Sequence, residues 1–289
     1  MRSQLDCLPC LGRNIVEFAR RMLPDEAGRL SAVRNGMAYL ADADMSLTPP
    51  EHCRALHEIA LGAAAGAGID PYAEEKAKSI GLANEIAANM DRISSYAPES
   101  FESRLRLAIA GNVLDFGIYS NLDMAQALDF IEKSFAKPID MEAVAVLKER
   151  MDSASSILYI LDNCGEAVFD RIFMEPYIDR TTFVVRGRNI LNDMTRRELE
   201  ASGFGGAKTL DSGTSIPGTI LPQCGQELQD AFKAADLVLA KGQGNFETLN
   251  DVDKPIAFLF LSKCPVVCRL IGAELNTIQI RLQNMRSTP

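Results

Sequence analysis

Short, continuous apolar runs in the second half of the chain constrain its fold more than any other feature. They cover residues 157–161, 182–185, 237–240 and 256–261, with a weaker run at 208–210. Runs of this length without polar alternation are typical of parallel strands that are buried on both faces. Helical patterns at 166–174, 195–201 and 226–234 separate them. Strand and helix therefore alternate, as in a doubly wound α/β sheet.

The first half of the chain has the long apolar periodicity of helices and no convincing strand. A capping oxygen precedes a glutamate by three residues at Asn14 and again at Thr48, which predicts two helix starts. We expect helices at residues 15–23, 26–42, 49–66, 72–93, 99–115, 122–135 and 141–152. The change of pattern predicts two domains, a helical lobe over residues 1–152 and an α/β domain over residues 153–289.

Composition narrows the range of partners and cellular locations. The chain has 30 Lys and Arg against 39 Asp and Glu, a net charge of −9, so there is no general electrostatic attraction to nucleic acid or to anionic membranes, and we expect neither as a partner. Its apolar runs fall far short of the roughly 20 residues that cross a bilayer. The first residues lack the apolar core of a signal peptide, so we expect a cytoplasmic protein. Seven dispersed cysteines are typical of reduced thiols rather than of a disulfide framework.

Polar side chains follow the predicted strands. Asp162 and Asn163 come directly after the first run, and Asp193 lies beyond the second. Because the carboxyl ends of parallel strands meet at one edge of a sheet, these three side chains are expected to lie together. Their hard oxygen ligands suit Mg²⁺ or Mn²⁺. Each residue has a simpler interpretation as well, as the cap of a following helix.

The segment 241–245, Lys-Gly-Gln-Gly-Asn, follows the fourth run. Its glycines allow backbone N–H groups to approach an anion, and Lys241 adds a point charge, so the segment is a candidate phosphate site. A tight turn with a solvated lysine explains it equally well. The segment lacks the ending of a Walker loop and has Glu247 where a dinucleotide-binding loop needs its third glycine. Arg186 and Arg188, near the same edge, are candidates for contact with an anionic part of a ligand.

Four blocks of sequence together resemble the metal-dependent damage-control phosphatases, a family long catalogued as a domain of unknown function. The blocks are 110–117 (Ala-Gly-Asn-Val-Leu-Asp-Phe-Gly), 161–166 (Leu-Asp-Asn-Cys-Gly-Glu), 188–195 (Arg-Asn-Ile-Leu-Asn-Asp-Met-Thr) and 241–247 (Lys-Gly-Gln-Gly-Asn-Phe-Glu). The spacing of Cys7 and Cys10 resembles the microbial branch of the family. The resemblance implies a three-layer α/β/α domain with a helical amino-terminal lobe. It also implies hydrolysis of phosphomonoesters of small metabolites with Mn²⁺, Co²⁺, Ni²⁺ or Mg²⁺.

The resemblance also implies roles for individual residues. Asp162, Asn163 and Asp193 are expected to hold the metal, and Asp162 or Asp193 either activates water or forms an aspartyl-phosphate. Around them, Lys241 is expected to bind phosphate, and Glu166 either positions water or caps a helix. The expected substrate-binding set is Asn112, Asp115, Glu166, Gly242, Gly244 and Asn245.

Other interpretations of the sequence stay open. Cys7 and Cys10 have the spacing of a metal knuckle that His52, Cys53 and His57 could complete, but a pair of reduced thiols near a loose terminus explains them more simply. A non-enzymatic protein that binds nucleotides or sugar phosphates would use the same sheet edge. An S-adenosylmethionine-dependent methyltransferase would need a glycine-rich first loop, whereas Gly165 stands alone there. The sequence does not indicate an oligomeric state.

Overall fold

A computed structural model describes residues 1–64, 70–114 and 124–285. Its centre is a six-stranded sheet with the strand order β3-β2-β1-β4-β5-β6. The strands are β1 (Ile157–Ile160), β2 (Thr181–Val185), β3 (Lys208–Asp211), β4 (Leu237–Lys241), β5 (Ile256–Leu261) and β6 (Ile278–Gln283). The first five are parallel and β6 pairs antiparallel with β5. The predicted α/β class with a mostly parallel sheet is confirmed.

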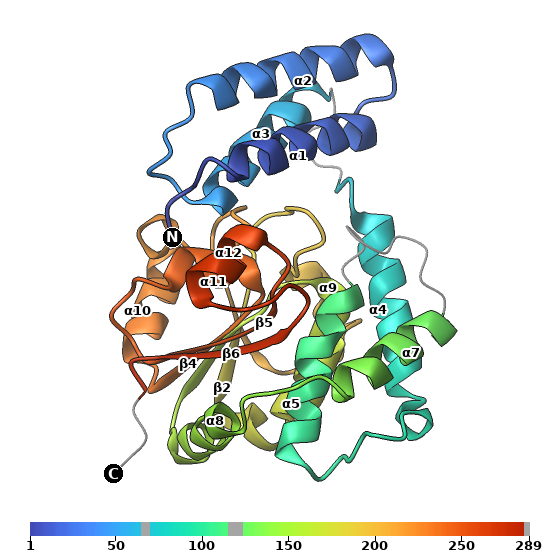
Figure 1. The fold of residues 1–289 in the computed structure, drawn as a ribbon, viewed down its shortest axis with the longest axis vertical. Coiled ribbons are helices and arrows are strands. Elements are labelled where there is room, and N and C mark those ends of the chain that lie inside the picture. The colour runs from blue at the N-terminus through green and yellow to red at the C-terminus, as the bar shows by residue number, and fades with distance from the viewer. Residues whose placement is uncertain (65–69, 115–123, 286–289) are drawn as a thin grey trace.

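Helices cover both faces of this sheet. Successive strand residues point to opposite sides, and in the four central strands both sets are largely apolar and buried. On one face Tyr159, Phe183 and Leu239 belong to a core shared with α4, α5, α7, α8 and α9. On the other face Ile160, Val184 and Val238 pack with side chains of α10, α11 and α12 (Figure 1). The helices on the first face are α4 (Ala73–Ala87), α5 (Phe101–Ala110), α7 (Met124–Phe135), α8 (Met141–Ser153) and α9 (Cys164–Met174). Those on the second are α10 (Gln226–Ala234), α11 (Gln243–Leu249) and α12 (Pro265–Ile271).

The first three helices, α1 (Cys7–Met22), α2 (Glu26–Ala41) and α3 (Pro49–Ala63), form a separate bundle at one end of the molecule (Figure 1). Leu11, Ile15 and Leu56 fill its core, together with Val266 from α12. The bundle therefore sits on the helices that follow β4 and β5. Most of the later helices of the predicted lobe pack on the sheet instead, and the division at residue 152 stays a prediction.

Three local expectations differ from the structure. The first helix begins at Cys7, so Asn14 lies inside it and caps nothing. Residues 195–201 contain only a short 3-10 turn, Arg196–Glu198, which Thr195 caps. The sheet also gains β6, which the sequence analysis missed. In the described part of the chain no helix combines the length and apolarity that a membrane crossing needs.

Candidate active site

A pocket of about 890 Å³ lies between α1 and the carboxyl edge of the sheet. It opens at the point where the strand order reverses, between β1 and β4, which is where open α/β sheets bind ligands. Asp162 follows β1 at this point, and Gln243 begins the helix after β4. The polar side chains that line the pocket near the sheet are those of Asn112, Asp162, Asn163, Asn192, Asp193, Gln243 and Lys263.

Backbone contacts bring Asp162 and Asp193 together, although 30 residues separate them in the sequence. The Met194 N–H donates to the Asp162 carbonyl at 2.8 Å, and the Cys164 N–H donates to the Asn192 carbonyl at 3.0 Å. Asn163 and Asp193 form an isolated antiparallel bridge. The loop after β2 is thus laid along the first residues after β1, as the shared strand edge predicts.

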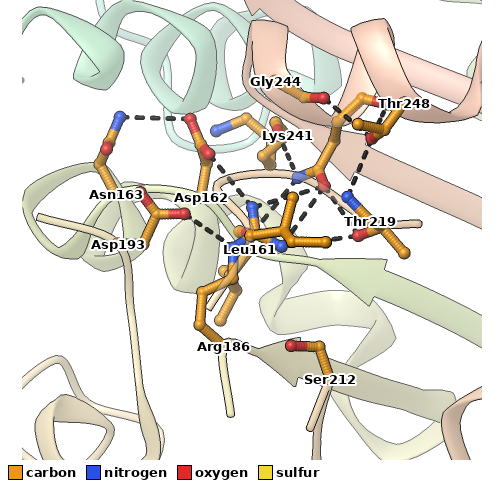
Figure 2. A network of polar contacts seen from close by, with 12 residues as sticks. Leu161, Asp162, Asn163, Arg186, Asp193, Ser212, Thr219, Lys241, Gly244 and Thr248 are labelled. Atoms are coloured by element: carbon orange, nitrogen blue, oxygen red, sulfur yellow. Dashed lines mark hydrogen bonds and ion pairs between the residues drawn. The ribbon is translucent and has the colours of Figure 1, made fainter. Parts of the chain in front are cut away.

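Arg186 lies directly behind the two carboxylates (Figure 2). Its Nε donates to Asp193 Oδ2 at 2.7 Å, and one of its terminal nitrogens lies 3.5 Å from Asp162 Oδ1. The guanidinium is buried, with a side-chain exposure of 1%, and Thr219 and Asn245 accept its other hydrogen bonds. Arg186 therefore separates and partly neutralises two carboxylates that would otherwise repel each other. It does not line the pocket, so the expected contact with a ligand is not supported.

The predicted metal ligands present the right atoms for a hard divalent cation. The Asn163 amide nitrogen donates to Asp162 Oδ2 at 3.2 Å, which leaves the amide oxygen as its coordinating atom. Two carboxylates and one amide oxygen thus border the pocket, a donor set that suits Mg²⁺ or Mn²⁺ and leaves coordination positions for water and ligand oxygens. Across residues 1–64, 70–114 and 124–285, no three His, Cys, Asp or Glu side chains cluster to hold a metal by themselves. The amide oxygen of Asn163 is therefore the third candidate ligand beside the two carboxylates, and the metal site stays a prediction.

The glycines after β4 serve close packing. Gly242 has a φ of +78°, in the left-handed region, and a Cβ at this position would lie 1.9 Å from Asp162 Oδ2. Its N–H donates to the Leu259 carbonyl at 3.1 Å, so this amide is already used within the sheet. Gly244 lines the pocket, and a Cβ there would lie 2.2 Å from the Pro217 carbonyl oxygen. Contact of either glycine with an anion stays a prediction. Gly244 is the better candidate because it lines the pocket and Gly242 does not.

Lys241 lies beneath the pocket rather than in it. Its side chain is completely buried, and Nζ donates to Asp170 at 2.5 Å and to the Ala108 carbonyl at 3.0 Å. Burial raises the pKa of Asp170 to about 7, against the opposing effect of the Lys241 charge. Burial alone would lower the pKa of Lys241, but Asp170 and Glu166 outweigh it and keep the pKa above its ordinary value. The lysine thus stays charged and balances buried carboxylates, and its expected role in binding phosphate stays a prediction.

Two other predicted residues connect this buried group to the pocket. Asn112 lines the pocket, and its amide nitrogen donates to Glu166 Oε2 at 2.6 Å. Glu166 is fully buried, with Oε1 at 3.6 Å from Lys241 Nζ. Asn245 is also buried and accepts from Arg186, so its position favours a supporting role over contact with substrate. Asp115 lies outside the described residues.

Lys263 is a cation at the sheet edge that lines the pocket and to which the sequence analysis gave no role. Its Nζ donates to the Asn112 carbonyl at 3.0 Å, and its N–H donates to Gln243 Oε1 at 3.1 Å. Lys263 follows β5 as Asp162 follows β1, so its position at the carboxyl end of a strand was the available signal. No motif distinguished it from Lys241 in the sequence, but Lys263 lines the pocket and Lys241 is buried beneath it.

The opposite wall of the pocket comes from α1, which the sequence analysis did not connect with the site. Its pocket-lining residues include Cys10, Asn14, Glu17 and Arg21, spaced by four, three and four positions as on one face of a helix. Arg21 pairs with Glu75 and lies over the Tyr72 ring, 4.4 Å from its centroid. The outer part of the pocket therefore carries both signs of charge beside the aromatic rings of Phe18 and Tyr72.

The Cys7 and Cys10 pair lies in the first turns of α1 and not in a loose terminus. Cys7 is buried, whereas Cys10 is exposed and lines the pocket. Burial raises the pKa of the Cys7 thiol, which keeps it protonated near neutral pH. His52 instead makes a hydrogen bond with the Tyr39 hydroxyl at 2.8 Å. The soft metal site considered from the sequence is not formed among the described residues.

Comparisons with known proteins agree with this architecture. The family model described as damage-control phosphatase ARMT1-like domain matches residues 3–278. The damage-control phosphatase PH1575 of Pyrococcus horikoshii is 33% identical over 276 residues, which cover 93% of this chain and 94% of that protein. A damage-control phosphatase of Archaeoglobus fulgidus is 29% identical over 282 residues, covering 93% of this chain and 95% of that protein.

The crystal structure of the Pyrococcus horikoshii protein, described as a DUF89 family protein, matches this fold with a TM-score of 0.86 at 29% identity. The match covers 96% of this chain and 98% of that one. The resemblance seen in the four sequence blocks is thereby confirmed, while the microbial branch with its cysteine pair stays a prediction. Because the family model spans nearly the whole length, this chain belongs to the damage-control phosphatase family with an ARMT1-like domain.

Proposed function

We propose that this protein is a metal-dependent phosphatase that hydrolyses phosphomonoesters of small metabolites. Its family membership supports a phosphatase. The observation that carries the metal dependence is the meeting of Asp162, Asn163 and Asp193 at one pocket, with Lys263 also in its lining. Metal-assisted phosphoryl transfer uses oxygen ligands for a divalent cation and a positively charged side chain near the phosphoryl oxygens, and this pocket offers candidates for both.

A bound divalent ion would supply Lewis-acid polarisation of the phosphoryl oxygens. The chain's own groups do the rest. Lys263 neutralises charge on a phosphoryl oxygen, and Asn112 and Gln243 keep the lysine in place through its Nζ and N–H contacts. Asp162 or Asp193 orients the attacking water or acts as the nucleophile. Arg186 keeps both carboxylates at a fixed spacing from behind.

The outer wall suggests the type of substrate. On this wall Asn14 and Glu17 offer hydrogen-bond donors and acceptors, which match hydroxyl groups on a substrate. A sugar phosphate or a phosphorylated fragment of a cofactor meets both this requirement and the size of the pocket. The proposed location of the protein is the cytoplasm, where such metabolites occur.

The test is release of inorganic phosphate from a panel of sugar phosphates and phosphorylated cofactor fragments. The purified protein is first treated with a chelator and then assayed with Mn²⁺, Co²⁺, Ni²⁺, Mg²⁺ or no metal. We expect turnover only with added metal. Binding of the phosphorylated ligands without turnover under every metal condition would instead identify a non-enzymatic binding protein. Activity that resists the chelator would exclude the metal site.

A further inference from the structure

The loop that carries Asp193 contains a strained residue. Leu191 has a φ of +47°, a left-handed conformation that costs an L-amino acid with a side chain about 1 kcal/mol or more. Such a conformation persists only where surrounding contacts impose it. Because Leu191 lies two residues before Asp193, whatever holds the loop also sets the position of that carboxylate.

Lys76 lies in the first turn of α4, and its side chain contacts the loop that carries Asp193. Its side chain has an exposure of 1%, and Nζ lies 2.9 Å from Asp70 Oδ2. The same Nζ donates to Asn189 Oδ1 at 3.4 Å, two residues before the strained Leu191. Lys76 does not line the pocket, so it reaches the site only through other residues.

A second contact connects Lys76 to the other end of the loop. Glu198 Oε1 lies 4.0 Å from Lys76 Nζ. The other oxygen of Glu198 accepts from the Thr195 N–H at 3.0 Å and from the Thr195 hydroxyl at 2.6 Å. One buried ammonium group thus faces a residue before Asp193 and, through Glu198, a residue after it.

We propose that Lys76 is a positioning residue for the metal-ligating loop, which it holds directly at Asn189 and indirectly at Thr195, through Glu198. Asp70 pairs with the lysine and directs it inward, since a buried ammonium needs a paired carboxylate. His57 adds no second positive charge near neutral pH, because burial lowers its pKa to about 4. By holding the loop as a clamp, Lys76 sets the spacing of Asp193 from Asp162 and Asn163. That this spacing matters for metal binding rests on the proposed function.

The clamp is tested with two variants and one control. Asn189→Ala removes the contact on the loop without leaving a buried charge, and Lys76→Met/Asp70→Asn removes the pair as a whole. The matched control is Arg106→Met/Glu102→Gln, which removes a partly buried ion pair of 2.8 Å on α5 whose two residues do not line the pocket. Circular dichroism and thermal unfolding establish that each protein is folded before any other measurement.

Three measurements then separate positioning from a merely structural role. Amide exchange over residues 188–195 is expected to rise about tenfold in both test variants and not in the control. The dissociation constant of Mn²⁺, measured by titration without substrate, is expected to weaken about tenfold. In turnover assays kcat at subsaturating Mn²⁺ should fall about tenfold, whereas KM for the substrate changes by less than about twofold.

Unchanged exchange over the loop would overturn the clamp itself. Faster exchange with unaltered Mn²⁺ affinity and kcat would show that the clamp does not position the metal ligand, and would overturn the proposal in that form. A wild-type protein that neither binds Mn²⁺ nor releases phosphate would contradict the proposed function and remove the metal-positioning role with it. The exchange measurement would then still report on the contact between Lys76 and the loop.

Discussion

Asp162 and Gly242 are packed so closely that only a glycine at position 242 leaves room for the carboxylate. A Cβ there would lie 1.9 Å from Asp162 Oδ2 and 2.3 Å from its Cγ. We therefore expect Gly242→Ala to displace Asp162, to weaken Mn²⁺ binding and to lower turnover by at least about tenfold. Isothermal titration with Mn²⁺ and a phosphate-release assay measure both effects.

Gly206→Ala is the control for that substitution. Gly206 has a φ of +81°, similar to that of Gly242, but no atom lies within 4 Å of a Cβ built there. Both variants should lose about 1 kcal/mol of stability from the left-handed backbone, and only Gly242→Ala should lose metal affinity. Equal Mn²⁺ affinities in the two variants would show that the contact with Asp162 has no functional role.

Replacement of either candidate metal carboxylate should remove activity without unfolding the protein. Asp162→Asn and Asp193→Asn keep the shape of the side chain but remove its charge. We expect each to lower kcat/KM by at least about 100-fold with any of the four metals. Asp211→Asn is the matched control, because Asp211 also ends a strand at this edge but pairs with Arg196 outside the pocket. An active Asp193→Asn enzyme would rule out the proposed ligand set.

The two lysines at the sheet edge should behave differently when they are removed. Lys263→Ala is expected to raise the inhibition constant of inorganic phosphate about tenfold, with little change in thermal stability. Lys241→Met should instead cost about 3 kcal/mol of stability, since it leaves Asp170 and Glu166 buried without their cation. Denaturant unfolding and phosphate inhibition measure the two effects. If Lys241→Met weakened phosphate inhibition and Lys263→Ala did not, Lys241 would be the phosphate-binding residue.

Stability should depend on pH through Glu247. Burial raises the pKa of this carboxyl from an ordinary value of 4.5 to about 7, while hydrogen bonding from Gln243 and the charge of the amino terminus oppose the rise. An unfolded chain therefore ionises Glu247 at lower pH than the folded one does. The stability that the protonated carboxyl contributes is full below about pH 4.5 and is lost as the pH rises through 7.

Glu247→Gln removes this dependence, because glutamine stays neutral and can still accept from Gln243. At pH 8 we expect the variant to be more stable than the wild type by up to about 3 kcal/mol. The difference should shrink as the pH falls toward 5.5. Urea unfolding at both pH values measures it. A difference that does not vary with pH would mean that Glu247 ionises normally in the folded protein.

The parallel strands could be predicted from the sequence because burial on both faces leaves an unbroken apolar run. The sixth strand alternates Ile278, Ile280 and Leu282 with polar residues. This is the pattern of an edge strand with one covered face, and it differs from the unbroken apolar runs that predicted the other strands.

The start of α1 was predicted wrongly because no capping box precedes its true first residue in the sequence. Asp6 makes no side-chain capping bond there, whereas Asn14 and Glu17 imitate a cap but line the pocket.

Within the site, the predicted convergence of Asp162, Asn163 and Asp193 follows from topology alone, because parallel strands end at one edge. The burial of Lys241 could not be predicted in this way. Lys241 points beneath the pocket because its ammonium group pairs with Asp170 on α9. Asp170 is 71 residues away in the sequence. Contacts of that range leave no local signal.

Because α1 forms the wall that faces the sheet, the two sides of the pocket come from distant parts of the sequence. The residues of the proposed metal and phosphate site that follow strands lie between positions 162 and 263, whereas much of the facing wall lies within residues 10 to 21. If the proposed function holds, substitutions on that one face of α1 would change which metabolite is accepted and leave the proposed metal ligands in place.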